Sequence, residues 1–229
     1  MASLFEEVGE VRGQGDGSAF ALSMRMFFKH PAMVGSGFPA SRWMVRTMLA
    51  PLDWRAIRTF VEYGPGAGAF THAILDRLAP DAKLVAIDTS PDFVSHLKAS
   101  ITDRRLYAVA GSATSVEAIL SKLGLQQADC ILSGLPFSTI SREEAGKIML
   151  ATRAALRPAG QFCAYQMRRA VEPLLRSHFS TVWRSYEWRN IPPCHLYWAK
   201  HENVADGREP KPRLPERPAG EPNILHCQN

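Results

Sequence analysis

The sequence predicts an α/β fold, in which a seven-stranded, mostly parallel sheet carries helices on both faces and ends in an antiparallel pair of strands. Three observations predict it. From residue 57 onward, short apolar runs alternate with segments of helical spacing, which is typical of a parallel sheet. A glycine-rich turn follows the first apolar run. Two aromatic-rich runs near residue 190 are joined by a link too short for a helical crossover, so these two strands are expected to be antiparallel.

The expected elements follow one another in a regular order. Ser41 is suited to cap a first helix that Pro51 ends, and Pro91 stands in the first turn of another helix, a position that proline favours. The strands are expected at residues 57–63, 83–88, 105–109, 128–132, 160–166, 181–188 and 194–199. The helices are expected at residues 41–49, 70–78, 91–99, 115–123, 141–157 and 168–178.

The limits of this alternation predict the domain organisation. Residues 1–50 are expected to form an N-terminal helical segment or lid, and residues 51–200 the nucleotide-binding domain. Residues 201–229 are expected to be a disordered tail, because the apolar period vanishes there and prolines crowd together.

Residues 18–30 in the N-terminal segment predict a basic, aromatic-rich helix. Such a helix suits a membrane interface, a lid over the active site, or simple packing on the core. Its apolar face comprises Phe20, Met24, Phe27 and Phe28, and its cations are Arg25 and Lys29.

Composition sets wide bounds on function. At 229 residues and 46% hydrophobic content, the chain is long enough for one α/β domain with a full core. The four cysteines form no C-x-x-C pair and no run of about 18 apolar residues appears, so we expect a reduced, cytoplasmic protein. A net charge of +5 fits an anionic partner, either nucleic acid or a membrane surface, and it also fits solubility alone.

The glycine-rich turn lies in residues 61–71, which read V-E-Y-G-P-G-A-G-A-F-T. A strand before it and a helix after it predict a nucleotide cradle, because glycines let a ligand approach the backbone N–H groups. Gly64, Gly66 and Ala69 also satisfy the dinucleotide fingerprint G-x-G-x-x-G/A. The turn by itself therefore suits both NAD and S-adenosylmethionine.

Other features favour S-adenosylmethionine. Asp88 ends the second strand, where a carboxylate meets the ribose hydroxyls of either cofactor. Glu62, however, lies two residues before the first glycine, and Gly68 extends the pattern to E-x-G-x-G-x-G. About sixty residues also precede the first strand. These three features point away from NAD.

A second motif, S-G-L-P-F at residues 133–137, directly follows the fourth strand. The carboxyl edge of an open parallel sheet is where ligands bind. A proline in such a loop stiffens it and frees carbonyls from regular secondary structure. We expect Phe137 to wall the pocket.

Together these motifs resemble class I S-adenosylmethionine-dependent methyltransferases, specifically the group similar to ribosomal RNA adenine dimethylases. The resemblance rests on E-Y-G-P-G-A-G, Asp88, the G-S-A of residues 111–113 and S-G-L-P-F. Within that group, the F-F-K, V-G-S-G-F-P-A-S-R and N-I-P-P-C-H-L-Y-W runs are similar to the bacterial phospholipid N-methyltransferase branch. The resemblance covers roughly residues 27–200 and implies a Rossmann-like methyltransferase domain.

The resemblance implies a set of cofactor-binding residues. The glycine turn (Gly64, Gly66 and Gly68) and Glu62 would hold the methionine part of the cofactor, and Asp88 the ribose. Ser112 and Ala113 would meet the adenine edge. Ser112 departs from the family, which usually has an acid there to accept from the adenine amino group.

The resemblance also implies a substrate. RNA adenine methylases carry N-L-P-Y, in which the asparagine accepts from the target base and the tyrosine stacks on it. Here Gly134 and Phe137 occupy those places, which disfavours a base and favours a lipid amine. The implied function is methylation of phosphatidylethanolamine for phosphatidylcholine biosynthesis. The alternatives are an rRNA adenine N6-dimethyltransferase and a cofactor-binding adaptor without catalysis.

Methyl transfer to an amine needs a neutral nitrogen close to the methyl carbon. The carbonyls of Ser133 and Leu135 are expected to accept hydrogen bonds from the amine, and Phe137 to stabilise the cation that forms. His195 and Tyr197 are candidates for proton removal, as is Tyr165. The candidate partners of a lipid phosphate are Arg168, Arg169, Arg184 and Arg189.

The expected partners are thus a phospholipid substrate and an anionic membrane surface, and nucleic acid is not expected. The expected location is the cytoplasm, in peripheral contact with the inner membrane. No metal site is expected.

Overall fold

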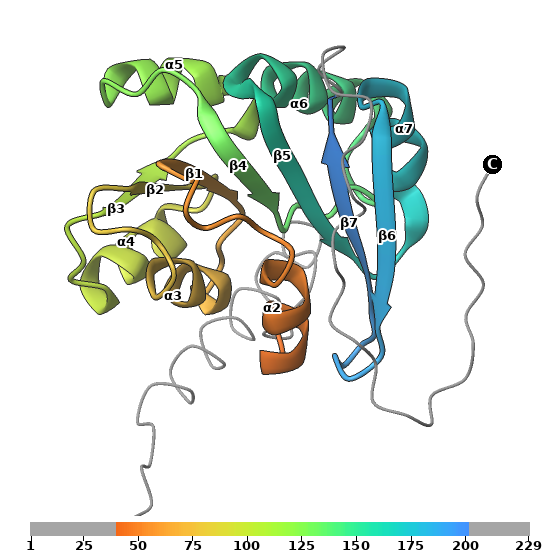
Figure 1. Ribbon diagram of the computed structural model, residues 1–229, viewed down its shortest axis with the longest axis horizontal. Coiled ribbons are helices and arrows are strands. Elements are labelled where there is room, and N and C mark those ends of the chain that lie inside the picture. The colour runs from red at the N-terminus through yellow and green to blue at the C-terminus, as the bar shows by residue number, and fades with distance from the viewer. Residues whose placement is uncertain (1–39, 202–229) are drawn as a thin grey trace, which may run out of the picture.

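The computed structural model describes residues 40–201, which form three layers with a sheet between two sets of helices (Figure 1). The helix predicted at residues 18–30 and the predicted tail lie outside the described residues.

The sheet has seven strands in the order β3-β2-β1-β4-β5-β7-β6. The first five strands of the chain pair in parallel, β7 is antiparallel to β5, and β6 is antiparallel to β7. The predicted mostly parallel sheet with an antiparallel edge pair is therefore confirmed. The strands are β1 (Thr59–Tyr63), β2 (Lys83–Asp88), β3 (Leu106–Ala110), β4 (Ala128–Ser133), β5 (Leu156–Gln166), β6 (Thr181–Glu187) and β7 (Cys194–Lys200).

The helices cover both faces of the sheet, with α2, α3 and α4 on one side and α5, α6 and α7 on the other (Figure 1). Two helix starts are fixed by serine caps, since Ser41 Oγ accepts from the Met44 N–H and Ser141 Oγ from the Glu144 N–H. The helices are α2 (Arg42–Leu49), α3 (Ala69–Leu75), α4 (Pro91–Ser100), α5 (Val116–Lys122), α6 (Arg142–Ala155) and α7 (Glu172–His178), with short 3₁₀ turns η1 (Ala113–Ser115) and η2 (Arg169–Val171).

Several helix ends differ from their predictions. Helix α3 ends at Leu75 rather than at residue 78, and α7 begins at Glu172, after the turn η2, rather than at residue 168. The spacing predicted a helix at residues 141–157, but α6 ends at Ala155 and β5 begins at Leu156. Pro158 explains why Arg157 is not helical, because the residue before a proline is sterically driven away from the helical region.

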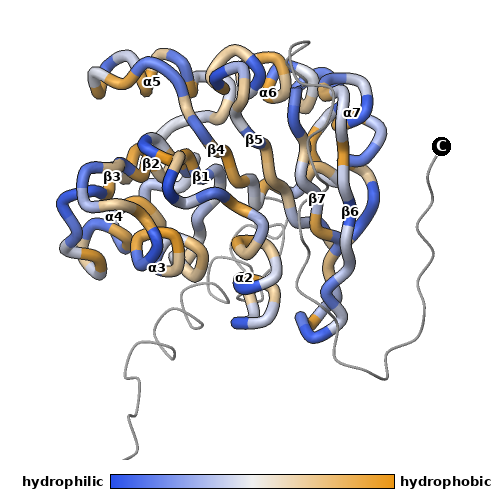
Figure 2. The backbone as a smooth tube through the Cα atoms, in the orientation of Figure 1, coloured by the Kyte–Doolittle hydropathy of each residue, from blue (hydrophilic) through white to orange (hydrophobic). Residues whose placement is uncertain are grey.

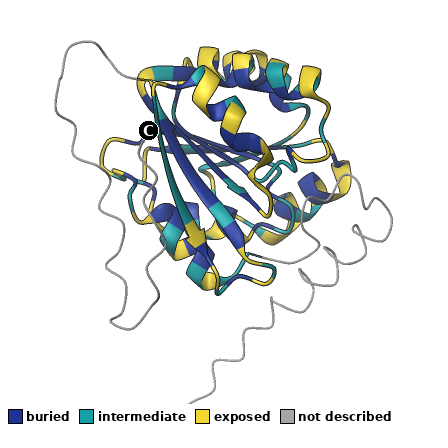
Figure 3. Cartoon of the chain, turned by 90° about the vertical axis from the view of Figure 1, so that its right-hand side faces the viewer, coloured by how far each residue is buried: buried dark blue, intermediate teal, exposed yellow. Residues whose placement is uncertain are grey.

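The core lies on both faces of the sheet, as expected for parallel strands covered by helices on each side. Every residue of β1 is buried. The strands are largely hydrophobic (Figure 2), and Figure 3 shows them as a buried centre with exposed residues on the outer surfaces of the helices. Helix α2 is part of this core, because Trp198 of β7 donates its indole N–H to the Met48 carbonyl at 3.0 Å.

The topology brings the candidate residues to one edge. The carboxyl ends of β1 to β5 lie together, and the β6–β7 loop joins them because β7 runs in the opposite direction and pairs His195 with Gln166. Connections from β1 lead outward through β2 to β3, whereas β4 and β5 extend the sheet on the other side. Such a reversal opens a crevice between β1 and β4, the usual ligand site of this architecture.

Candidate active site

The glycine turn joins β1 to α3 and holds three residues in the left-handed region, with φ of 63° at Gly64, 55° at Gly66 and 89° at Gly68. No atom lies within 4 Å of the position that a Cβ at Gly66 would take. At Gly68 a Cβ would lie 2.8 Å from Leu97 Cδ2, so this glycine is needed for packing. The space above Gly66 is open, as a ligand cradle requires.

Glu62 lies beneath this turn and is 2% exposed. Its Oε2 accepts a 2.7 Å hydrogen bond from the Thr71 hydroxyl of α3. Burial raises the pKa of Glu62 to about 8, and the charge of Asp88 adds to this while Thr71 opposes it. A cationic group bound beside Glu62 would favour the carboxylate form, because opposite charges attract strongly where water is excluded.

Asp88 ends β2, the neighbouring strand, and accepts a 2.8 Å hydrogen bond from the Ser90 N–H. Burial raises its pKa, and hydrogen bonds from the backbone N–H groups of Ser90 and Gly66 act in the opposite direction. The structure thus brings Glu62, the glycine turn and Asp88 together at the ends of two adjacent strands.

Ser112 and Ala113 follow β3, on the other side of Asp88, whose carbonyl accepts from the Gly111 N–H at 2.9 Å. The Ser112 hydroxyl caps η1 by accepting from the Thr114 N–H at 3.2 Å. Ala113 is buried. Their predicted contact with adenine stays a prediction, and the Ser112 oxygen already has a partner.

The S-G-L-P-F loop follows β4 and touches the glycine turn. Gly134 donates its N–H to the Tyr63 carbonyl at 2.8 Å, and the Ser133 hydroxyl accepts from the Leu135 N–H at 3.3 Å. The Leu135 carbonyl accepts from the Phe137 N–H at 3.0 Å and from Gln166 Nε2 at 2.6 Å. That carbonyl therefore has two donors before any substrate amine arrives.

Phe137 is only 5% exposed and belongs to the core cluster beneath α5 and α6. The structure places it in the core rather than on an open wall. Its predicted contact with a substrate amine stays a prediction.

His195 and Tyr197 lie on β7, separated from β1 by β4 and β5. Tyr197 is fully buried, its hydroxyl donates to Glu172 Oε2 at 3.4 Å, and burial raises its pKa to about 12. The ring of His195 packs 4.8 Å from that of Tyr186, and its buried Nδ1 has no hydrogen-bond partner among residues 40–201. Burial, with the charges of nearby arginines, lowers the pKa of His195. The structure does not bring these two side chains to the glycine turn.

The arginines proposed for a lipid phosphate are mostly held by carboxylates. Arg169 and Arg184 pair with Glu172 at 2.9 and 3.0 Å, and so does Arg176, which was not among those proposed, at 3.0 Å. Burial alone would raise the pKa of Glu172, but the three guanidinium groups lower it to about 2. Arg189 pairs with Glu187 at 2.8 Å.

Sequence reasoning missed three supporting residues, namely Thr71, Gln166 and Glu172. Thr71 carried a signal, since it stands in the first turn of the helix that follows the glycines, facing back to Glu62. Gln166 contacts the loop after β4 and Glu172 of α7 contacts β7, so both act through residues distant in the chain and carried no signal.

Comparison with known proteins identifies the family. A family model described as "Methyltransferase domain" matches residues 60–160. An ornithine lipid N-methyltransferase of Singulisphaera acidiphila is 31% identical over 183 residues, covering 79% of this chain and 95% of that protein. The chain belongs to the class I S-adenosylmethionine-dependent methyltransferases, in the lipid N-methyltransferase branch.

Other relatives of this methyltransferase match less of its length or only its fold. A ribosomal RNA small subunit methyltransferase H of Nitrosomonas europaea is 34% identical over 96 residues, covering 42% of this chain and 30% of that protein. The N-methyltransferase NodS of Bradyrhizobium japonicum, solved with S-adenosyl-L-homocysteine, superposes with a TM-score of 0.56 at 14% identity, covering 82% and 99% of the two chains. The second match shows the fold alone.

The cofactor of the methyltransferase is S-adenosylmethionine. The residues present fit it, because the space above Gly66 is open and Glu62 and Asp88 offer acidic groups at the same edge. Among residues 40–201 no helix is long and apolar enough to cross a membrane, and no cluster of metal-binding side chains occurs there.

Proposed function

We propose that this methyltransferase transfers methyl groups to the primary amine of a membrane aminolipid. The observation that carries the proposal is the 31% identity to an ornithine lipid N-methyltransferase over 95% of that protein's length. Two different observations suggest two candidate substrates. The relative favours ornithine lipid, and the sequence motifs favour phosphatidylethanolamine. We rank ornithine lipid first, because whole-length identity is the broader observation.

The proposed roles of the cofactor-binding residues follow from their positions. Glu62 and the glycine turn would hold the methionine part, Asp88 the ribose and Ser112 with Ala113 the adenine. When bound, the cofactor supplies a methyl group that the amine nitrogen takes with its lone pair, leaving the carbon–sulfur electron pair on sulfur. Leu135 Cδ2 lies 3.3 Å from the position of a Cβ at Gly64, so the S-G-L-P-F loop and the cradle border one crevice.

The substrate amine must be neutral to react. Its reference pKa is near that of lysine, about 10.4, and apolar surroundings lower it. Leu135 and the buried strand ends supply such surroundings. The alkylammonium formed by the transfer then loses its extra proton to water. His195 is the alternative acceptor proposed from the sequence, and two strands separate it from the cradle.

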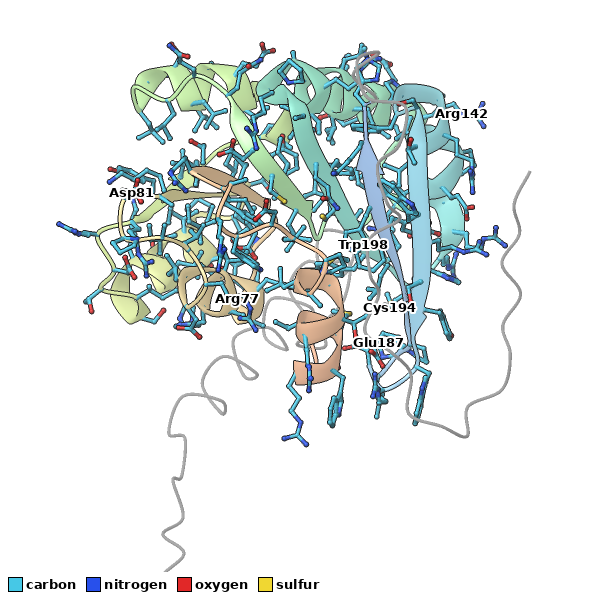
Figure 4. All side chains as sticks on the ribbon, in the orientation of Figure 1. Arg77, Asp81, Arg142, Glu187, Cys194 and Trp198 are labelled. Atoms are coloured by element: carbon cyan, nitrogen blue, oxygen red, sulfur yellow. The ribbon has the colours of Figure 1, made fainter. Side chains whose placement is uncertain are left out.

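We also propose peripheral association with the cytoplasmic surface of the inner membrane. Four of the five exposed large hydrophobic residues in the described part of the chain gather near the β6–β7 loop, at the substrate edge. This apolar edge patch comprises Met167, Tyr186, Trp188 and Ile191. Glu187 and Cys194 flank the loop next to α2 (Figure 4), where Thr47 donates to Glu187 at 2.8 Å. Exposed apolar side chains gathered at one edge are suited to a lipid surface.

The test incubates the purified full chain with methyl-labelled cofactor and separate vesicles of ornithine lipid, of phosphatidylethanolamine and of phosphatidylcholine, together with a pool of ribosomal RNA. Label in either aminolipid, absent from phosphatidylcholine, supports the proposal and identifies the substrate. Label in RNA alone would establish the RNA enzyme. Cofactor binding without label in any pool would favour the adaptor without catalysis.

A further inference from the structure

Gly134, the first residue after β4, is a glycine for an unusual reason. Its φ lies outside the left-handed region, so its backbone would accept any L-residue. A Cβ at this position would nevertheless lie 2.9 Å from Cζ of Tyr165 and closer still to the tyrosine hydroxyl oxygen. The Tyr165 hydroxyl therefore fills the volume in which a side chain at residue 134 would begin.

This volume borders the cofactor cradle. The same Cβ position lies 3.0 Å from the carbonyl oxygen of Gly64, the first glycine of the turn. The hydroxyl is thus held where the ends of β1, β4 and β5 meet, at the reversal of strand order that opens the crevice. Tyr165 is partly exposed, whereas its strand neighbour Ala164 is fully buried.

The ring of Tyr165 is fixed in place. It stacks on Phe70 of α3 with the ring centroids 4.9 Å apart, and β7 pairs with Tyr165 through Leu196. Burial, followed by the charge of Glu62, raises the pKa of Tyr165, so the phenol stays protonated near neutral pH. A protonated phenol is no general base, but its oxygen still accepts a hydrogen bond.

Two nearby acceptors of the loop are already engaged. The Leu135 carbonyl receives two donors and the Ser133 hydroxyl one. A neutral amine that enters the crevice has N–H groups that need acceptors, because an unpaired buried donor is costly.

We propose that the Tyr165 hydroxyl oxygen accepts a hydrogen bond from the substrate amine and so directs the nitrogen lone pair toward the methyl donor. Gly134 makes room for this hydroxyl. The inference rests on the proposed function and deepens it. Tyr165 keeps its own proton throughout, and the proton released by the reaction goes to water.

If the Tyr165 hydroxyl accepts a hydrogen bond from the amine, its effect depends on how many methyl groups the amine carries. A purely structural role in packing would not have this dependence. A neutral primary amine carries two N–H groups, a monomethylated amine one, and a dimethylated amine none. The contact therefore assists the first two transfers and is absent from a third. Loss of the hydroxyl should weaken binding of unmethylated lipid and leave fully methylated lipid unaffected.

The test compares Tyr165→Phe with a control variant, Tyr107→Phe. The control removes the hydroxyl of the partly buried Tyr107 on β3, and strands β2, β1 and β4 separate β3 from β5. Calorimetry with S-adenosylhomocysteine-saturated full-length protein measures the affinity for unmethylated and trimethylated aminolipid in mixed micelles. For Tyr165→Phe we expect about fivefold to tenfold weaker binding of unmethylated lipid, as for a lost neutral hydrogen bond, and unchanged binding of trimethylated lipid. The turnover number for the first transfer should fall at least as far. Tyr107→Phe should match the wild type.

Three outcomes for Tyr165→Phe would overturn the inference. Its affinity for unmethylated and trimethylated lipid could fall equally, its affinity for neither lipid could fall, or its affinity for S-adenosylhomocysteine could fall. The last outcome would assign Tyr165 to the cofactor. Gly134→Ala supplies a second variant, because its methyl group displaces the hydroxyl without removing it. It should reproduce the defect of Tyr165→Phe. Failure of the proposed function itself is distinguishable, since the wild type would then methylate no aminolipid.

Discussion

The Thr71 hydroxyl donates a 2.7 Å hydrogen bond to a Glu62 carboxylate oxygen that is almost wholly buried. This bond ties the first turn of α3 to the end of β1 across the glycine turn. It stabilises the carboxylate form, yet burial outweighs it and raises the pKa of Glu62 from 4.5 to about 8. The cradle of the cofactor-free methyltransferase therefore holds a proton near neutral pH.

The first prediction concerns stability. Because the folded-state pKa of Glu62 is raised, its contribution to stability is fully present below about pH 4.5 and declines as the pH rises to about 8. Glu62→Gln removes this titration. In urea unfolding of cofactor-free protein, the wild type should lose on the order of a few kcal/mol between pH 5 and 8, at about 1.4 kcal/mol per pKa unit, and the variant clearly less. Parallel declines would mean that another group titrates.

The second prediction concerns the proton. The ammonium of the methionine part favours the Glu62 carboxylate, so cofactor binding at pH 7 should release a proton and tighten as the pH rises from 6 to 8. Calorimetry in two buffers of different ionisation enthalpy measures this release. Glu62→Gln should bind more weakly and release less. An unchanged release would assign the proton to Asp88, whose pKa is also raised.

The third prediction tests the cradle by comparing two glycines with similar backbone conformations. Gly66 and Gly124 have φ of 55° and 71°, and neither has an atom within 4 Å of a Cβ position. Alanine at either site should lower the free energy of unfolding by about 1 to 2 kcal/mol, the cost of left-handed backbone. Only Gly66→Ala should also weaken cofactor binding, by about tenfold or more, because its methyl group enters the open space above the turn. Equal affinities of the two variants in calorimetry would place the cofactor elsewhere.

These residues show what the sequence could and could not predict. The meeting of Glu62, the glycine turn and Asp88 was predictable, because neighbouring parallel strands end at the same edge and the glycine spacing marks the turn. The end of α6 was predicted two residues too late, although Pro158 already keeps Arg157 out of the helical region.

The contacts of Tyr165 with Gly134 and of Gln166 with Leu135 join residues about thirty positions apart. They depend on which face of β5 each side chain takes, and that face is fixed only when the strand register is known. Phe137 illustrates a further limit. An aromatic residue after a proline suits both a pocket wall and a core, and the sequence pattern is the same for each.

The fourth prediction tests whether the Phe137 ring is a core residue or a wall of the pocket. Its ring is 5% exposed in the core cluster, so Phe137→Ala should lower the free energy of unfolding by about 3 to 5 kcal/mol. Urea denaturation measures this loss. A variant as stable as the wild type that nevertheless loses lipid methylation would show that the ring lines the site, as the motif led us to expect.

The fifth prediction concerns the apolar edge patch. Ile191 is 77% exposed in the β6–β7 loop, whereas Leu150 is 63% exposed on α6. If the substrate edge faces the membrane, Ile191→Asp removes apolar area and adds a charge that anionic lipid repels. Flotation with anionic vesicles should then recover several-fold less of this variant than of the wild type, and Leu150→Asp should float normally. Equal flotation of all three proteins would exclude the patch as the contact. Residues 18–30 would then carry the association, and replacing Phe27 and Phe28 by serine should abolish flotation while leaving cofactor affinity unchanged.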